Sequence, residues 1–266
     1  MIPFSRQKIF NNDIKEVVKV LKSDFLTKGR KVLEFEKNLS KSVKAKYAIS
    51  CNSGSSALLL ACRALSLKNN DIVWTVPNTY AASANCALES GAKIDFIDID
   101  PKSWNISISQ LEKKLKQSKA RNKLPKVLIL VHLAGTPNKL DKIRKLSKKY
   151  KFKIVEDASH ALGAKYNGNK VGSCKYSHLT VFSFHPVKMI TTGEGGAVTT
   201  NDKQLWKKLL AYRSHGVERN LTAREKKTKP WLFNQNYLGF NYRMTDIQAS
   251  LGISQMKRLK SFVKKR

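Results

Sequence analysis

The chain has 266 residues, of which 41% are hydrophobic, so it is long enough to bury one large core or two small ones. Its 51 lysines and arginines outnumber 19 acidic residues and give a formal net charge of +32. Such a charge is typical of nucleic-acid-binding proteins, but here the lysines are spread over predicted helix surfaces without any nucleic-acid-binding motif. We therefore expect no specific nucleic-acid partner, and at most weak, nonspecific adhesion to polyanions.

The sequence contains no apolar stretch long enough to span a membrane, and its first residues lack the apolar core of a signal peptide. We therefore expect a cytoplasmic protein with no membrane partner. The cysteines show neither a C-x-x-C pair nor a Cys/His cluster of the zinc type, so we expect buried thiols, with no metal site and no disulfide framework. They are Cys51, Cys62, Cys86 and Cys174.

Two amphipathic helices are predicted at the start of the chain, over residues 12–23 and 32–43. The segment 24–30 between them turns at Gly29. On these residues alone, the region is an ordinary helix–turn–helix. In the first helix, the apolar residues predicted to share one face are Ile14, Val17, Val18 and Leu21. In the second, the residues expected to face inward are Val32, Leu33, Phe35 and Leu39.

A short strand at 47–51 leads through Gly54 into an apolar helix at 57–65. Such a strand–glycine–helix junction directs free backbone N–H groups at an anion, helped by the helix dipole. The hydroxyls of Ser55 and Ser56 could join this anion site, or they could serve only as helix caps.

Further strands alternate with helices along the chain, which favours a mainly parallel sheet covered on both faces. We therefore predict an α/β fold, a three-layer αβα sandwich. Sites in such sheets open at the carboxyl ends of strands, where Cys51, His132 and Asp157 are predicted to lie. His132 is interpreted as a core histidine with its hydrogen bonds satisfied. The other predicted strands are 72–75, 93–99, 126–131, 152–155 and the two halves of 179–200. Further helices are predicted to begin near residue 76 and near residue 109, and another is predicted to end near residue 150. The last two predicted helices cover 203–212 and 245–259.

One lysine has unusual neighbours. Lys188 follows Ser183 in a β-rich run, and an upstream apolar strand ends in Asp157. Pyridoxal phosphate needs an amine for a Schiff base, a carboxylate for its ring nitrogen and donors for its phosphate, and Lys188, Asp157 and Ser183 are of these types. A lysine in so basic a chain is more often a solvated surface residue. Burial would lower the lysine pKa and favour a nucleophilic amine.

Three motifs in this region occur in the order D-A-S-H-A-L-G at 157–163, F-S-F-H-P-V-K at 182–188 and T-T-G-E-G-G-A at 191–197. Together they resemble the DegT–DnrJ–StrS family of sugar-nucleotide aminotransferases. The resemblance implies the large domain of the type I fold of pyridoxal-phosphate enzymes, with Lys188 and Asp157 as catalytic residues. A sugar dehydratase of the same fold would lack the Schiff-base lysine.

The resemblance also implies roles for other residues. Tyr80 would stack on the cofactor ring, and His160 would lie near its phenolic oxygen. Thr27, Lys28 and Gly29, together with Ser183, would contact the sugar nucleotide. The cofactor phosphate would be bound by Gly54, Ser55 and Ser183.

Two later motifs also match the family, R-S-H-G at 213–216 and L-G-F-N-Y-R-M at 238–244. By resemblance, Asn241 reaches the cofactor phosphate of a partner subunit, which implies a homodimer with shared active sites. On sequence alone, a surface-loop asparagine is the alternative. Residues 217–236 are polar and are expected to form a mobile loop. No role follows from the sequence for His185, beyond its closeness to Lys188, or for His215.

We divide the chain into an N-terminal helix and substrate-side segment (1–30), a cofactor-binding large domain (31–240) and the start of a helix leading to a small domain (241–266). Family members continue past this point, so the small domain is expected to be missing and the activity of the chain alone is in question. The motifs are most like those of members that move an amino group, from glutamate, to a UDP-linked 4-keto-6-deoxy sugar for pseudaminic acid. Perosamine or bacillosamine-type aminotransferases are the near alternative, and a noncatalytic or regulatory member is the alternative of another class.

Overall fold

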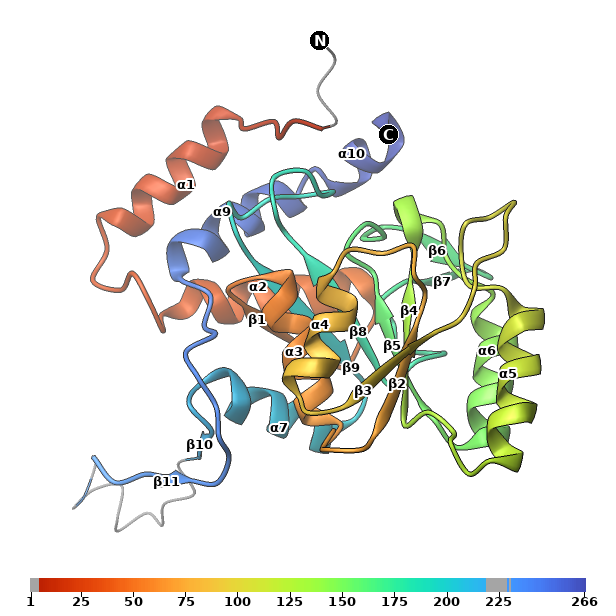
Figure 1. Ribbon diagram of the computed structural model, residues 1–266. Coiled ribbons are helices and arrows are strands. Elements are labelled where there is room, and N and C mark those ends of the chain that lie inside the picture. Colours follow the sequence, from red (N-terminus) through yellow and green to blue (C-terminus); the bar gives the residue numbers. More distant parts are fainter. Residues whose placement is uncertain (1–4, 219–228, 230) are drawn as a thin grey trace.

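A seven-stranded sheet forms the centre of the molecule in the computed structural model, which describes residues 5–218, 229 and 231–266 (Figure 1). The strand order is β1-β9-β8-β5-β4-β2-β3. All neighbouring pairs are parallel except those of β9, which is antiparallel to both β1 and β8. The strands are β1 (Tyr47–Cys51), β2 (Ile72–Thr75), β3 (Lys93–Phe96), β4 (Val127–Val131), β5 (Lys153–Asp157), β8 (Leu179–Ser183) and β9 (Gly196–Thr200).

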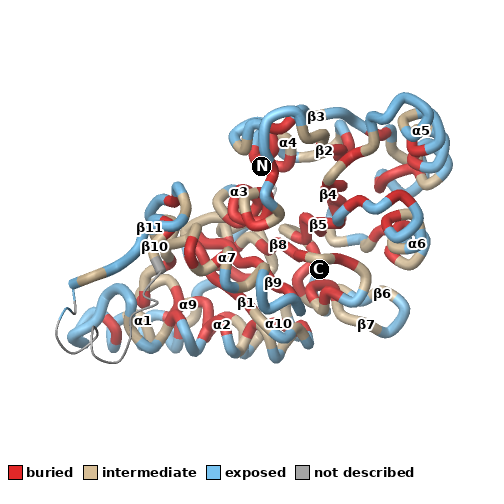
Figure 2. Tube along the Cα trace, turned by 90° about the horizontal axis from the view of Figure 1, so that it is seen from below, coloured by how far each residue is buried: buried red, intermediate tan, exposed pale blue. Residues whose placement is uncertain are grey.

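Successive residues of a strand point to opposite faces of the sheet, and here the residues on both faces are mainly apolar. Helices therefore cover both faces. In β4, Ile129 packs with one group of helices, whereas Leu128 and Leu130 pack on the opposite face. The first group is α3 (Gly54–Ala64), α4 (Ala82–Glu89) and α7 (Lys203–Arg213). The opposite face carries α2 (Arg30–Val43), α9 (Asp246–Met256), α5 (Ile108–Ala120) and α6 (Leu140–Tyr150). The predicted three-layer αβα sandwich is confirmed, and Figure 2 shows its buried residues along the strands and the inner sides of the helices.

The first helix, α1 (Asn11–Leu21), lies along α9 (Figure 1). Three of the four apolar residues that the sequence groups on one face of this helix are exposed. Ile14, Val18 and Leu21 are 54%, 38% and 55% exposed. This face points outward because a different side of the helix, which carries the buried carboxylate of Asp13, packs against α9. The carboxylate accepts a hydrogen bond from Gln255 Nε2 on α9 at 2.7 Å and forms an ion pair with Arg258.

Leu33 was predicted to face inward, and this prediction was wrong. It is exposed on α2, whereas Val32, Phe35 and Leu39 are buried as predicted. The stripe that faces the sheet continues through Leu39 to Val43, at helical spacing that leaves Leu33 on the outer side.

The remaining elements are short. They are the turn η1 (Leu133–Gly135), the hairpin strands β6 (Lys165–Tyr166) and β7 (Asn169–Lys170), the pair β10 (Val217–Glu218) and β11 (Asn234–Gln235), and the helix α10 (Leu259–Lys265). The predicted mobile loop at 217–236 falls largely outside the described residues. Within the described part of the chain, no helix is long and apolar enough to cross a membrane.

Candidate active site

Three of the sequence motifs meet where neighbouring strands end. Strands β5 and β8 are parallel, and Asp157, the last residue of β5, is paired in register with Val181. Strand β8 then ends at Ser183, which is paired with Gly196 at the start of β9. The segment that joins β8 to β9 carries Lys188. The sheet itself therefore brings Asp157, Ser183 and the lysine loop to one edge.

Both carboxylate oxygens of Asp157 accept hydrogen bonds. Ser83 Oγ on α4 donates to Oδ2 at 2.7 Å, and Ser159 Oγ donates to Oδ1 at 2.6 Å. Since the Ser83 hydroxyl donates to Asp157, the hydroxyl of Thr79, 2.9 Å away, must donate to Ser83. Asp157 is only 6% exposed, so these hydroxyls fix the orientation of a buried carboxylate.

The amine of Lys188 lies 2.7 Å from His160 Nε2. Burial lowers the pKa of Lys188 below its ordinary value, and the charge of Arg266 acts in the same direction, against the opposing effect of Asp157. Burial, followed by the charge of Lys188, also lowers the pKa of His160. A neutral imidazole is therefore favoured, in which Nε2 accepts a hydrogen bond from the Lys188 amine. The lowered pKa makes the free, nucleophilic amine of Lys188 easier to form than that of an exposed lysine.

Ser183 packs against the turn between β1 and α3. A Cβ added to Gly54 would lie 2.8 Å from Ser183 Cβ, and a Cβ on Gly196 would lie 2.2 Å from the carbonyl oxygen of Ser53. Glycine is needed at both positions because these backbones approach so closely. The amino end of α3 is therefore held against the end of β8, as a cradle for an anion requires.

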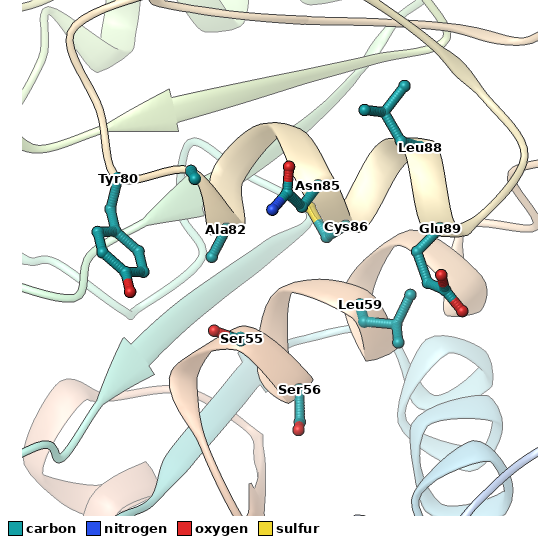
Figure 3. A pocket seen from close by; sticks show the side chains of 10 residues that line it. Ser55, Ser56, Leu59, Tyr80, Ala82, Asn85, Cys86, Leu88 and Glu89 are labelled. Atoms are coloured by element: carbon teal, nitrogen blue, oxygen red, sulfur yellow. The ribbon is translucent and has the colours of Figure 1, made fainter.

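The capping role considered for Ser55 and Ser56 belongs to Ser53. Its Oγ accepts the backbone N–H of Ser56 at 3.0 Å. Ser55 is exposed and lines a groove of about 740 Å³ between α3 and α4 (Figure 3). Tyr80 lines the same groove and is 81% exposed, which excludes the alternative of a core aromatic.

The predicted substrate residues lie at a second hollow. Lys28 and Gly29 line a pocket of about 230 Å³ together with Arg243. Lys28 and Arg243 also line an adjoining pocket of about 630 Å³, which His215 borders. Thr27 is exposed in the same loop.

Asn241 does not line the groove between α3 and α4 or either of the two pockets beside Lys28. It forms a β-bridge with Ser214 after α7, and the next residue, Tyr242, accepts the backbone N–H of Asn52 at 2.8 Å. Among the contacts of the described residues, none joins Asn241 to Lys188 or Asp157.

Several contacts escaped the sequence analysis. Ser159 follows Asp157 by two residues, a spacing at which a hydroxyl can bond to a carboxylate, whereas Ser83 is 74 residues distant and gave no signal. Glu36 on α2 and Arg213 of the R-S-H-G motif form a largely buried ion pair at 2.6 Å. No local pattern in the sequence pairs these two residues, which lie 177 positions apart.

The histidines near the site differ in burial and in hydrogen-bond partners. His132 is buried, with Nε2 2.8 Å from Glu156 Oε2 and Nδ1 accepting the backbone N–H of Asn138, so the predicted core role is confirmed. His185 is partly exposed and lies 4.0 Å from Glu194. The ring against the Lys188 amine is therefore that of His160.

These residues fit pyridoxal phosphate. A partly buried amine of lowered pKa stands beside a buried carboxylate, and a glycine-dependent helix start with nearby hydroxyls suits its phosphate. Together with the αβα sheet, they define the cofactor-binding large domain of the type I fold.

The chain belongs to the DegT/DnrJ/EryC1/StrS aminotransferase family, which it matches over residues 7–266. The cofactor of this family is pyridoxal phosphate. The resemblance seen in the sequence motifs is therefore confirmed.

Individual relatives refine this assignment. The chain is 44% identical to a UDP-4-amino-4,6-dideoxy-N-acetyl-beta-L-altrosamine transaminase of Campylobacter jejuni, covering 100% of this chain and 67% of that protein. It is 37% identical to a GDP-perosamine synthase of Caulobacter vibrioides over 87% of this chain and 57% of that protein. The solved structure of Helicobacter pylori PseC, an aminotransferase involved in the biosynthesis of pseudoaminic acid, superposes with a TM-score of 0.88 at 35% identity, covering 97% of this chain and 66% of that one. The chain thus spans about two thirds of the length of the Campylobacter jejuni transaminase and of the Helicobacter pylori enzyme.

Proposed function

We propose that this chain forms the cofactor-binding part of an aminotransferase that moves an amino group, from glutamate, to a UDP-linked 4-keto-6-deoxy sugar. The observation that carries the proposal is the Lys188 amine at 2.7 Å from His160, with a lowered pKa and the buried Asp157 carboxylate nearby. The proposal extends to biosynthesis of a surface amino sugar such as pseudaminic acid, and to work in the cytoplasm.

Bound pyridoxal phosphate supplies an electron-withdrawing ring, which allows an amino group to pass between an amino acid and a keto sugar. Lys188 would hold the cofactor covalently and carry protons on Nζ. His160 can accept a proton at Nε2, because its lowered pKa keeps the ring neutral near pH 7. Asp157, oriented by Ser83 and Ser159, would present its carboxylate to the ring nitrogen.

The phosphate would be held by Gly54, Ser55 and Ser183, and Tyr80 would cover the ring from the groove between α3 and α4 (Figure 3). Thr27, Lys28 and Gly29 would contact the nucleotide sugar. The higher identity to the altrosamine transaminase than to the perosamine synthase favours a UDP-linked over a GDP-linked substrate.

A homodimer completes the proposal, with Asn241 serving the cofactor phosphate of the partner. The segment around Asn241 exposes large apolar side chains, with Trp231 and Leu238 each 70% exposed. A patch of this kind suits burial against another chain. No contact within the described residues ties Asn241 to the lysine of its own chain, which is consistent with a role across the interface.

The test uses the complete natural chain, purified with pyridoxal phosphate. We expect a yellow absorbance band that borohydride bleaches, with the cofactor then attached to the peptide containing Lys188. We also expect glutamate-dependent amination of a UDP-linked 4-keto-6-deoxy sugar in preference to a GDP-linked one. Lys188→Ala should abolish both signals, whereas Lys142→Ala, at an exposed position on α6, should change neither. Unchanged labelling and multiple turnovers in Lys188→Ala would refute the assignment.

A further inference from the structure

A buried carboxylate outside the lysine site holds the loop that precedes α2. Asp246, the first residue of α9, is 1% exposed. Its Oδ2 accepts the backbone N–H of Gly29 at 2.8 Å, and its Oδ1 accepts that of Lys31 at 2.8 Å. The N–H of Asp246 itself donates to the carbonyl oxygen of Leu26 at 2.9 Å. These hydrogen bonds tie residues 26–31 to the start of α9, across 217 positions of sequence.

The same contact explains the glycine of the loop. Gly29 has a φ of −88°, which other residues adopt readily, so backbone conformation does not require glycine. A Cβ at this position would lie 2.7 Å from Asp246 Oδ1 and 3.0 Å from Phe25 Cβ. Gly29 is therefore needed because the carboxylate approaches so closely. The preceding residue, Lys28, has a φ of 59°, a left-handed conformation that a non-glycine residue keeps when its surroundings impose it.

Asp246 also replaces a local helix cap. The N-cap residue of α2 is Gly29, which has no side chain, and the carboxylate that takes the free N–H groups there comes from α9. The residues just before α9 face the same hollow as the loop. Arg243 and Met244 line the 230 Å³ pocket with Lys28 and Gly29, so Asp246 fixes the two sides of this pocket relative to each other.

We propose that Asp246 is a positioning residue for the nucleotide sugar, acting through the 26–31 loop that places Lys28 opposite Arg243. The inference rests on the proposed function, in which Thr27, Lys28 and Gly29 contact this substrate. In this proposal, Gly29 is required by its close contact with the Asp246 carboxylate. The exposed side chains of Thr27 and Lys28 contact the substrate. A purely structural cap would contribute stability without affecting the binding of one substrate in particular.

The first test is Asp246→Asn in the full natural chain. The amide has one acceptor oxygen, so one of the two backbone N–H groups loses its partner. We expect faster hydrogen–deuterium exchange in residues 26–31 and a KM for the nucleotide sugar raised roughly tenfold or more, by loss of a hydrogen bond to a charged group. The KM for glutamate, kcat at saturating substrates and the absorbance of the bound cofactor should stay at wild-type values.

Asp202→Asn is the matched control. Asp202 caps α7 through the backbone N–H groups of Gln204 and Leu205, at 2.7 and 3.2 Å, away from the loop. Oδ1 alone accepts both bonds, and Asn retains this oxygen, so the variant removes the charge of an N-cap, should cost little stability and should change neither KM. If Asp246→Asn behaves like Asp202→Asn, or if exchange in residues 26–31 is unchanged, Asp246 is a cap only and the proposal is overturned.

A steric test uses Gly29→Ala, whose Cβ collides with the carboxylate. Alone, it should raise the nucleotide-sugar KM. Combined with Asp246→Ala, it should add little further, since the clashing group is gone, whereas independent effects would multiply. Multiplicative effects would contradict the contact on which the proposal depends.

Calorimetric titration with UDP separates this proposal from the proposed function. If the wild-type protein binds UDP but aminates no keto sugar, the proposed function is refuted and the positioning role of Asp246 is not. If Asp246→Asn binds UDP with wild-type affinity although residues 26–31 exchange faster, the positioning role is refuted and the proposed function is not. No UDP binding by the wild type would sink both.

Discussion

Removing the charge of Glu36 should destabilise the protein far more than removing that of its near neighbour Glu34. Glu36 Oε1 accepts hydrogen bonds from Ser50 N at 2.8 Å, Ser50 Oγ at 2.9 Å and Arg213 at 2.6 Å. The two ion-pair side chains are 11% and 13% exposed. Glu36→Gln keeps the shape but leaves the Arg213 cation without its buried counter-charge.

Breaking a buried ion pair by removing one partner costs about 3–5 kcal/mol. For a domain of this size, about 1 kcal/mol shifts Tm by roughly 2–4 °C, so Tm should fall by roughly 6–20 °C. The matched control is Glu34→Gln on the same helix. Glu34 pairs with Lys31 at 2.9 Å on the surface, and its loss should cost about 0.5 kcal/mol or less.

The assay is urea unfolding of the three proteins, followed by circular dichroism. A double-mutant cycle with Arg213→Met isolates the pair, because the second substitution removes the unpaired charge and should recover part of the lost stability. Equal effects of Glu36→Gln and Glu34→Gln, with an unchanged m-value, would refute the reasoning. The predicted functional consequence is a misplaced Asn241, since Arg213 leads directly into the Ser214–Asn241 bridge.

Two further predictions concern the site. Asp157→Asn should retain the fold but reduce turnover strongly, because a neutral amide cannot keep the cofactor ring nitrogen protonated; wild-type steady-state rates would remove Asp157 from the mechanism. If Asn241 serves the partner subunit, mixing Lys188→Ala and Asn241→Ala homodimers of the full chain should restore activity towards half the wild-type level per heterodimer, because one site then carries neither defect. No gain at limiting cofactor, in mixtures shown to exchange subunits, would place the action of Asn241 within its own chain.

The sequence by itself determined the strands and helices, because their signals are local. Period-2 alternation and apolar runs predicted the strands at 47–51 and 72–75 at their observed bounds. The strand predicted at 152–155 continues to Asp157, since two acids are tolerated in a buried strand when Ser83, Ser159 and His132 satisfy them. Motif order around Lys188 was enough to predict the family, and the predicted parallel sheet placed Asp157 at the carboxyl end of a strand, where the structure has it.

The tertiary structure decided which face of a helix is buried and which distant side chains meet. Periodicity groups Ile14, Val18 and Leu21 on one face, but only the packing of Asp13 against α9 shows that this face points outward. The partners of Asp157, Arg213 and Gly29 lie 74, 177 and 217 residues away in the sequence. Contacts over such separations depend on the path of the whole chain, so no local pattern of residues encodes them.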